Sequence, residues 1–274
     1  MPELPEVETV VRGLQGCVAG KTISEIEYCA PHLRKLNLRG FAGKVAGRII
    51  DSIDRIGKNI FINLDDGAVF LVHLRMTGQL LYCCQQVPED NHNHLKMNFV
   101  GNGEALLFRD VRKFGHFIHI PAKKKSAYIE SMGLGEDALK IEADSFVEVL
   151  KSKKRMIKPL LLDQSVVAGL GNIYVDEILH RSKVHPQKIS SGIASRKLRE
   201  MYDHMQRILR FSIENMGTTF DSFSGVNSEP GRNQNYLLAY NNAGKLCSLC
   251  GKRKIKRIVV AQRGTFICTN CQRP

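Results

Sequence analysis

The sequence is short of features that several classes of protein need. It has no tryptophan, and aromatic residues make up 7% of its 274 residues. No apolar run approaches the ~18 residues of a membrane span. Its first residues include acids where a secretory signal would carry bases and then an apolar stretch. We therefore expect a cytoplasmic protein with no membrane-spanning segment.

Acidic residues are scarce relative to basic ones. The chain has 40 Lys and Arg against 27 Asp and Glu, a formal charge of +13. This excess favours a polyanionic partner, either nucleic acid or an anionic membrane surface. No basic amphipathic helix or stacking-aromatic sheet motif is evident, which argues against a membrane-surface or RNA-binding protein. The length allows two domains with hydrophobic cores.

The apolar pattern changes along the chain. Short apolar runs separated by turn signals predict antiparallel strands from Lys21 to about Pro121, and a helical period begins near Asp144. A polar, glycine-rich stretch from Thr218 to Asn235 predicts a mobile loop. We expect an α+β protein of two domains. The predicted segments are an N-terminal antiparallel β-sandwich with flanking helices (1–121), a linker (122–143), a helical region (144–235) and a cysteine module (236–274).

The N-terminus combines an amine with carboxylates. Pro5 suits the first turn of a helix, and an apolar stripe would anchor that helix to a core: Val7, Val10, Val11 and Leu14. If Met1 is removed, Pro2 exposes a secondary amine, which at neutral pH has more free base than a lysine. With Glu3 and Glu6 beside it, this rim is a candidate active site. The alternative is an ordinary capped helix start.

Four cysteines form two tight pairs near the C-terminus. Cys247 and Cys250 are separated by seventeen residues from Cys268 and Cys271, the spacing of a four-thiolate zinc site. Four thiolates leave zinc no open position, so we expect one structural ion. The segment between the pairs predicts a hairpin with strands at 258–261 and 265–267, and it presents Arg263 at the turn. From Gly244 onward the chain is basic and has no acid.

Two further regions have residues suited to nucleic acid. Around Lys158 and Asn172 the pattern predicts a helix, a glycine-rich turn and a second helix capped by Asn172, whose N–H groups could hold a phosphate. Such a turn is also a common tight connection. In the predicted sheet, Lys58 precedes a strand, and two glycine turns follow large side chains: His73, Met76, Arg112 and Phe114. Met76, Arg112 and Phe114 could fill the gap left by a flipped base, although Met and Phe are commonly core residues.

The motifs, taken in order, carry a resemblance. PELPEVET, GKNIF, HLRMTG, RDVRKFG, IKPLLLDQ, GLGNIYVDEIL, NYLLAY and QRGTFICTNCQ are similar to those of the bacterial formamidopyrimidine-DNA glycosylases, base-excision enzymes that remove oxidised purines. The resemblance implies that the helical region is a helix–two-turns–helix element and that residues 236–274 form a four-cysteine zinc-finger hairpin. It also implies a monomer acting on damaged duplex DNA in the bacterial cytosol or nucleoid.

The resemblance also implies roles for residues. Pro2 would attack C1′ of the flipped nucleotide and form a Schiff base, Glu3 would protonate the sugar ring oxygen, and Glu6 would be an accessory carboxylate. Lys58 and Arg263 would bind the phosphates beside the lesion, helped by Lys158 and Asn172. Met76, Arg112 and Phe114 would fill the space that the flipped base leaves in the stack. His73 would be a further DNA-binding residue.

The implied activity is that of a bifunctional glycosylase and abasic-site lyase that cuts the strand by β- and δ-elimination and needs no catalytic metal or small-molecule cofactor. Two alternatives remain open, an endonuclease VIII type enzyme for oxidised pyrimidines and a catalytically inactive zinc-dependent DNA-binding protein. The chain departs from the family pattern at four places. Arg75 and Gln262 each stand where the family usually has a glycine, and Val111 stands where it usually has a proline. Asn241–Asn242 stand where it usually has Gly-Arg.

Overall fold

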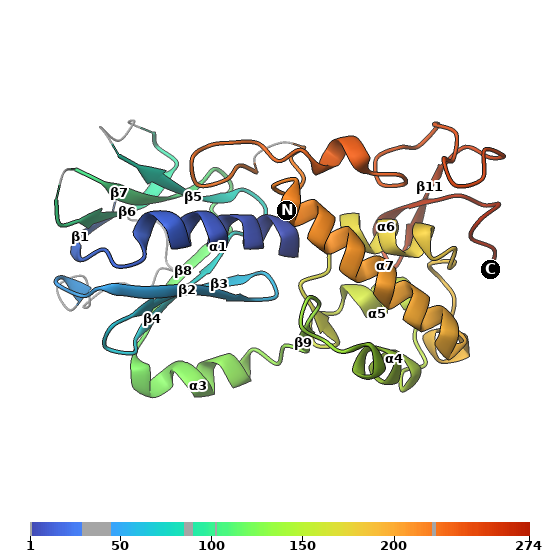
Figure 1. Ribbon diagram of the computed structural model, residues 1–274, viewed down its shortest axis with the longest axis horizontal. Coiled ribbons are helices and arrows are strands. Elements are labelled where there is room, and N and C mark those ends of the chain that lie inside the picture. The colour runs from blue at the N-terminus through green and yellow to red at the C-terminus, as the bar shows by residue number, and fades with distance from the viewer. Residues whose placement is uncertain (1, 29–44, 85–89, 102, 221–222) are drawn as a thin grey trace. The chain divides into compact units, whose positions relative to one another are not determined.

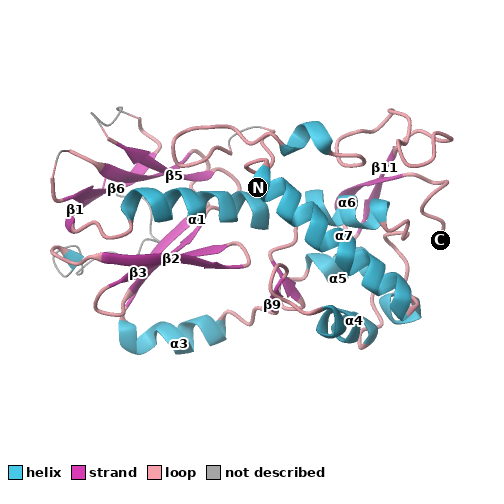
Figure 2. Cartoon of the chain, viewed as in Figure 1, coloured by secondary structure: helices cyan, strands magenta, loops and turns pink. Residues whose placement is uncertain are grey.

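The computed structural model describes residues 2–28, 45–84, 90–101, 103–220 and 223–274. Figures 1 and 2 show the path of the chain and its secondary structure. Met1, on whose removal the predicted amine depends, lies outside the described residues. The chain forms two compact units. Unit 1 comprises Met1–Gly133 and Asn215–Arg232, and unit 2 comprises Leu134–Glu214 and Asn233–Pro274.

Strands dominate unit 1, and helices dominate unit 2. The described helices are α1 (Leu4–Val18), α3 (Ala122–Ser131), α4 (Ala143–Lys151), α5 (Ile157–Leu162), α6 (Asn172–Arg181) and α7 (Ser195–Glu214), with 3-10 turns at Ser190–Gly192 and Asn233–Tyr236. The strands are β1 (Ile23–Tyr28), β2 (Ile50–Ile56), β3 (Asn59–Leu64), β4 (Val69–His73), β5 (Gly78–Cys83), β6 (Asn93–Phe99), β7 (Ala105–Asp110), β8 (His116–Ile120), β9 (Glu136–Asp137), β10 (Val167–Ala168), β11 (Lys256–Val260) and β12 (Arg263–Ile267). No described helix is long and apolar enough to cross a membrane.

Unit 1 is built on two four-stranded antiparallel sheets. Their strand orders are β1-β6-β7-β5 and β2-β3-β4-β8. Helix α1 lies between the sheets (Figure 1) and contributes to the same hydrophobic core as both of them. The predicted α+β class with an N-terminal antiparallel sandwich is confirmed. Helix α3, which follows β8, occupies part of the segment predicted to be a linker.

Helix α1 begins where the sequence predicts. Glu3 is its N-cap, Pro5 lies in its first turn, and the predicted apolar stripe is buried. The Glu3 side chain accepts a hydrogen bond from the Glu6 backbone, and the Glu3 N–H donates to Glu6 Oε2 over 2.8 Å. This reciprocal capping box satisfies two N–H groups that would otherwise lack helical partners. The two carboxylates are thereby fixed at the start of the chain.

The polar stretch predicted to be a mobile loop contributes to the core of unit 1. Phe223 and Val226 are buried in that core, and the Tyr82 N–H donates to Val226 O over 2.9 Å. A Cβ placed on Gly13 would lie 2.5 Å from Val226 Cγ2, so glycine permits this close approach of the segment to α1. This packing could not be predicted from the sequence, because the two apolar residues that pack into the core stand in a polar segment and form no periodic pattern.

Unit 2 packs its helices against one another and against the C-terminal hairpin. Helix α7 buries an apolar stripe of Leu198, Met201, Met205 and Leu209. Helix α6 packs against α5, α7 and β12. The hairpin of β11 and β12 turns at Ala261 and Gln262, both with positive φ, so Arg263 lies one residue beyond the turn, at the start of β12. The predicted turn at Gln262–Gly264 is thus displaced toward the N-terminus.

A buried ion pair joins the hairpin to the helices. Lys158 of α5 and Asp176 of α6 are essentially inaccessible, with Nζ to Oδ1 at 2.6 Å. Lys158 Nζ also donates to Thr265 Oγ1 (2.8 Å) and to Gly264 O (3.1 Å), while Asp176 Oδ2 accepts the Phe266 N–H at 2.9 Å. Burial outweighs the attraction of Lys158 and raises the pKa of Asp176. Removing either Lys158 or Asp176 should therefore destabilise the fold strongly, because it leaves the other charge buried without a partner.

Asp176→Ala should destabilise the protein by about 3 kcal/mol, because it leaves the Lys158 ammonium buried without an anion. The free energy of unfolding in urea measures this loss. Glu200→Ala is the matched control, since it removes a half-exposed partner of Lys197 on α7 and should change stability by less than about 1 kcal/mol. Equal losses in the two variants would contradict the role given to the buried pair.

Candidate active site and nucleic-acid interface

The residues at the N-terminus of α1, which form the candidate active site, are buried in unit 1. Pro2, Glu3 and Glu6 are all buried, and Glu6 Oε1 accepts the Thr218 N–H at 2.7 Å. Gly217 precedes Thr218 with φ of +76°, and a Cβ there would lie 2.9 Å from Glu6 Cγ, so the close approach requires glycine. The Glu6 carboxylate therefore holds the start of α1 and the segment after α7 together.

Lys58 lies in the tight turn between β2 and β3. Gly57 has φ of 58°, and Lys58 is only 6% exposed, so it is not a solvated surface lysine. Arg55 braces this turn, because its Nε donates to Glu8 Oε2 over 2.6 Å and its Nη1 donates to Gly57 O over 3.3 Å. Since Glu8 belongs to α1, this ion pair links the helix that starts at the candidate amine to the turn that carries Lys58.

His73 ends β4, near the positive charge of Lys58. Its Nδ1 accepts the Arg75 N–H at 3.0 Å, so the neutral ring carries its proton on Nε2. Burial first, and then the charges of Arg75, Lys58 and His116, lower the pKa of His73 to about 3. The ring is therefore neutral at physiological pH and can donate one hydrogen bond from Nε2, as a phosphate oxygen would require.

Three side chains from two separate turns meet on the surface of unit 1. Arg112 Cζ lies 4.9 Å from the centre of the Phe114 ring, and Arg112 Nη1 lies 3.2 Å from Met76 Sδ. Met76 and Phe114 are 41% and 50% exposed. The alternative that these two residues are core residues therefore does not hold. An exposed group of apolar and planar side chains is suited to enter a base stack.

Asp110, which the sequence reasoning did not single out, organises both turns. Its carboxylate is buried and accepts the Gly115 N–H at 2.7 Å and the Arg112 N–H at 3.2 Å. Thr77, which follows Met76, donates its hydroxyl to the same carboxylate and accepts the Arg112 N–H. The only feature of the sequence that pointed to Asp110 was its place as the second residue of the motif RDVRKFG.

In unit 2, Lys158 and Asn172 both contact the hairpin beside Arg263. Asn172 is the first residue of α6, and Gly171 is its N-cap, so the prediction that Asn172 caps this helix was wrong. The Asn172 side chain instead donates from Nδ2 to Gly264 O over 2.9 Å. Its buried Oδ1 has no hydrogen-bond partner among the described residues. Lys158 directs its ammonium to the partners named above and is fully buried.

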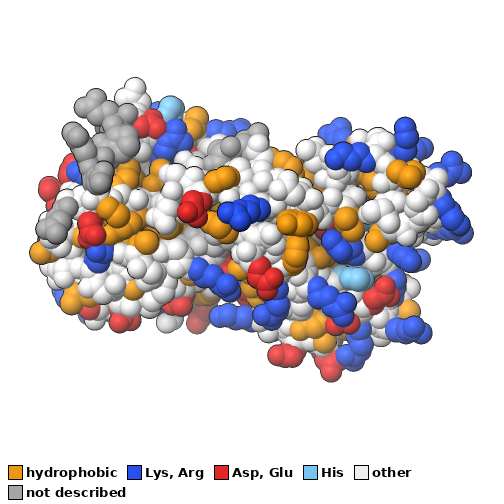
Figure 3. All heavy atoms as spheres, turned by 45° about the horizontal axis from the view of Figure 1, so that its top comes forward, with side chains coloured by type: hydrophobic (Ala, Val, Ile, Leu, Met, Phe, Trp, Pro, Cys, Tyr) orange, Lys and Arg blue, Asp and Glu red, His pale blue; other side chains and the backbone are white. Residues whose placement is uncertain are grey.

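Arg263 itself is exposed at the head of β12. The basic residues of the C-terminal module surround it in sequence: Lys245, Lys252, Arg253, Lys254, Lys256, Arg257 and Arg273. Lys and Arg side chains are frequent over unit 2 on the face shown in Figure 3. This part of unit 2 therefore offers positive charge to a polyanion.

The four predicted cysteines form one metal site. Their sulfur atoms all lie within 4.8 Å of one another. Cys247 Sγ lies 3.9 Å from Cys271 Sγ, and Cys250 Sγ lies 3.7 Å from Cys268 Sγ. Zinc–sulfur bonds of about 2.3 Å in a tetrahedron place sulfur atoms about 3.8 Å apart. The site therefore fits one structural zinc ion, as the sequence predicts.

Three departures from the family pattern share one backbone property. Arg75, Asn241 and Gln262 have φ of 53°, 59° and 61°, in the left-handed region that favours glycine. The sequence places a larger residue at each of these positions, where glycine would be free of strain. Asn tolerates this conformation best, whereas Arg75 and Gln262 store strain in the turns beside Met76 and Arg263.

The neutral His73 makes stability depend on pH. Its folded pKa lies below the unfolded value of about 6.5, so the unfolded state binds more protons between those values, and stability falls as the pH drops through that window. Between about pH 6.5 and pH 4.5 the wild type should lose about 2 kcal/mol more than His73→Gln. Urea unfolding at several pH values measures this, with the exposed His92→Gln as control. Parallel wild-type and His73→Gln curves would contradict it.

Family models match most of the chain. They are the formamidopyrimidine-DNA glycosylase N-terminal domain at residues 1–117, the H2TH domain of the same enzymes at 134–224, and a zinc finger found in FPG and IleRS at 244–274. The chain is 42% identical to a formamidopyrimidine-DNA glycosylase of Streptococcus pyogenes, over 100% of this chain and 99% of the relative.

Solved structures agree with the sequence comparison. The fold matches the wild-type Lactococcus lactis Fpg (MutM) in complex with DNA containing N7-benzyl-Fapy-dG, with a TM-score of 0.91, 35% identity and full coverage of both chains. It also matches the Lactococcus lactis Fpg in complex with DNA containing an abasic site, with a TM-score of 0.91, 34% identity and full coverage of both chains. The chain belongs to the formamidopyrimidine-DNA glycosylase family.

Proposed function

We propose that the protein is a bifunctional DNA glycosylase that removes oxidised purines, such as 8-oxoguanine and formamidopyrimidines, from duplex DNA and then cuts the strand. The observation that carries the proposal is the rim of Pro2, Glu3 and Glu6, held by the capping box at the start of α1. The family membership and the DNA complexes of its relatives support the same function.

The proposed reaction begins with the Pro2 amine, once Met1 has been removed. The amine attacks C1′ of the flipped nucleotide while Glu3 protonates the sugar ring oxygen. The damaged base leaves with the bonding electrons and takes up the proton that the amine loses, and the ring-opened sugar stays joined to Pro2 as an iminium ion. Because Glu3 is anchored by the Glu6 N–H, its carboxylate has a fixed position near the amine.

Strand cleavage follows from the same intermediate. The positive iminium nitrogen acidifies the C2′ proton, and a base removes that proton as the 3′ phosphate leaves. A second elimination then expels the 5′ phosphate, and hydrolysis of the imine releases Pro2. A carboxylate beside the amine can serve first as acid and then as base. Neither step requires a redox cofactor or a catalytic metal.

The remaining predicted residues would bind the DNA. Lys58 and Arg263 would hold the phosphates beside the lesion, with His73 donating from Nε2. Three residues would enter the stack after base flipping, consistent with their exposure as one group: Met76, Arg112 and Phe114. Lys158 and Asn172 would support the hairpin that carries Arg263. A DNA repair enzyme of this kind would act as a monomer in the bacterial cytoplasm.

A duplex carrying 8-oxoguanine opposite cytosine should be cut on both sides of the lesion by the wild type. Pro2→Gly, which leaves a primary amine, should reduce this activity by at least about tenfold while thermal unfolding stays nearly unchanged. Denaturing gels of the labelled strand report the products. Faster cutting of an oxidised-pyrimidine duplex would place the protein with the endonuclease VIII type. Full activity of a Pro2→Gly chain that retains Met1 would contradict the proposed nucleophile.

Arg263→Ala should weaken binding to lesion and undamaged duplex alike, because a phosphate contact has no sequence information. The slope of log K against log salt should fall by about one unit. Fluorescence anisotropy at several salt concentrations measures the slope. Arg196→Ala, at an exposed position on the first turn of α7, is a charge-matched control. An unchanged slope in Arg263→Ala would remove Arg263 from the phosphate contacts.

A further inference from the structure

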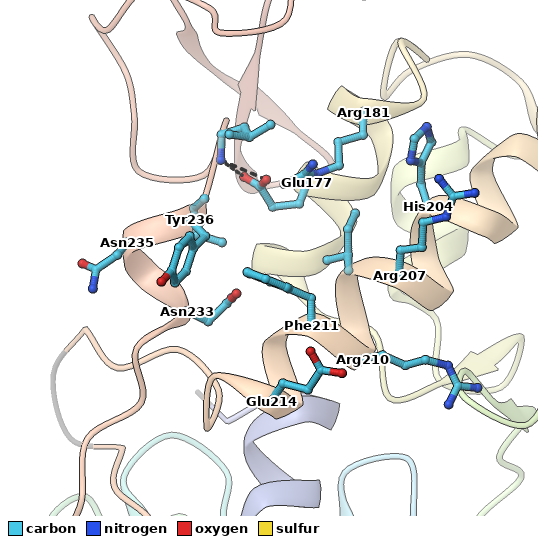
Figure 4. Close-up of a pocket in the computed structure, with 13 residues that line it drawn as sticks. Glu177, Arg181, His204, Arg207, Arg210, Phe211, Glu214, Asn233, Asn235 and Tyr236 are labelled. Atoms are coloured by element: carbon cyan, nitrogen blue, oxygen red, sulfur yellow. Dashed lines mark hydrogen bonds between the residues drawn. The ribbon is translucent and has the colours of Figure 1, made fainter.

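Unit 2 has a cavity of about 810 Å³ that the proposed reaction does not use. It lies between α6, α7 and the segment 233–238, and we call it the α6–α7 pocket (Figure 4). Its volume is in the range of known ligand sites. Arg181, which lines it, lies at the opposite end of α6 from Asn172. This length of helix is about 13 Å, so Arg181 lies away from the contact of Asn172 with the hairpin.

One part of the pocket has uncompensated positive charge. Arg181, His204 and Arg207 lie together there (Figure 4). Within the described part of the chain, neither arginine has a carboxylate within ion-pair distance. Arg181 Nε is buried without a hydrogen-bond partner among those residues. Burial, and beyond it the charges of Arg181 and Arg207, hold the pKa of His204 below its usual value although Glu200 opposes them.

Glu177, an acid that also lines the pocket, already accepts hydrogen bonds from the backbone. Glu177 is 1% exposed, and its Oε1 accepts the N–H groups of Ala239 at 2.7 Å and Tyr240 at 2.9 Å. Its Oε2 accepts the Leu238 N–H at 3.0 Å. These bonds hold the segment that forms one wall of the pocket. Glu177 therefore shapes the wall, and the positive field of the arginines remains open to an incoming anion.

The other part of the pocket is apolar. Phe211 of α7 and Tyr236 meet edge to face with ring centres 5.1 Å apart, and they are 42% and 50% exposed. Ile208 and Leu237 also line the pocket. Exposed aromatic rings next to arginines are typical of the centres of protein interfaces. A bare phosphate backbone would satisfy the cations but would leave this apolar part unfilled.

We propose that the α6–α7 pocket docks a short acidic segment of a partner protein. Its carboxylates pair with Arg181 and Arg207, and an aliphatic or aromatic side chain that follows them packs against Phe211 and Tyr236. The two arginines select a negatively charged segment, and the aromatic pair selects a segment that also has an apolar side chain. Docking at this pocket would recruit the enzyme without occupying the residues proposed to act on DNA.

The test uses the full-length, zinc-loaded protein and a fluorescein-labelled peptide of four aspartates followed by two leucines. Fluorescence anisotropy should show saturable binding below about 1 mM. Arg207→Glu should weaken it by at least about tenfold, and Phe211→Ala by a similar factor. Arg196→Glu, an equal charge change on the exposed first turn of α7, should leave it unchanged. Cleavage of the lesion duplex should be unaffected in all three variants.

Control peptides separate the two parts of the pocket. Replacing the aspartates with lysines, or the leucines with serines, should each abolish most of the binding. No saturable binding of the acidic peptide, or equal weakening by Arg196→Glu and Arg207→Glu, would overturn the proposal. Binding of a short oligo-dT that depends on Arg207 and displaces the peptide would also overturn it, because the pocket would then be a nucleic-acid contact.

Discussion

The buried carboxylate of Glu6 is the constraint on which the proposed chemistry depends. Chain ends are commonly frayed, and an amine at a frayed end would have no defined position. Here Glu6 accepts the N–H groups of Glu3 and Thr218, so it ties the first residues both to their own helix and to a distant segment. The apolar stripe of α1 then fixes that helix between two sheets. These contacts would give the proposed nucleophile, Pro2, a defined position.

The hairpin of unit 2 needs comparable support. A two-stranded hairpin is marginally stable alone, and this one has strain at Gln262. The four-cysteine site lies at its base, while Lys158 and Asp176 hold the strand that begins with Arg263. The exposed guanidinium is thus supported by a buried ion pair and a metal site. The proposed phosphate contact belongs to Arg263, whereas its support comes from Lys158 of α5, Asp176 of α6 and the four cysteines.

Much of this organisation could be predicted from the sequence. The helical stripe of α1, the sandwich and the cysteine spacing depend on local patterns that the structure confirms. The role of Asp176 could not be foreseen, because its partners Lys158 and Phe266 are distant in the sequence. Asp110 joins the two turns through its bond to Thr77, which is also distant from it in the sequence. The burial of Phe223 and Val226 was hidden for a different reason, since two apolar residues in a polar stretch give no period. Asn172 was misplaced by one residue because helix caps depend on backbone angles.

If the Pro2 amine is the nucleophile, it forms a covalent imine with damaged DNA. The most direct measurement is borohydride reduction of the protein mixed with a duplex containing 8-oxoguanine, followed by mass spectrometry of the trapped peptide. One adduct is expected, on Pro2 of a chain that lacks Met1. An adduct on a lysine, or none from zinc-loaded protein shown to lack Met1, would contradict it.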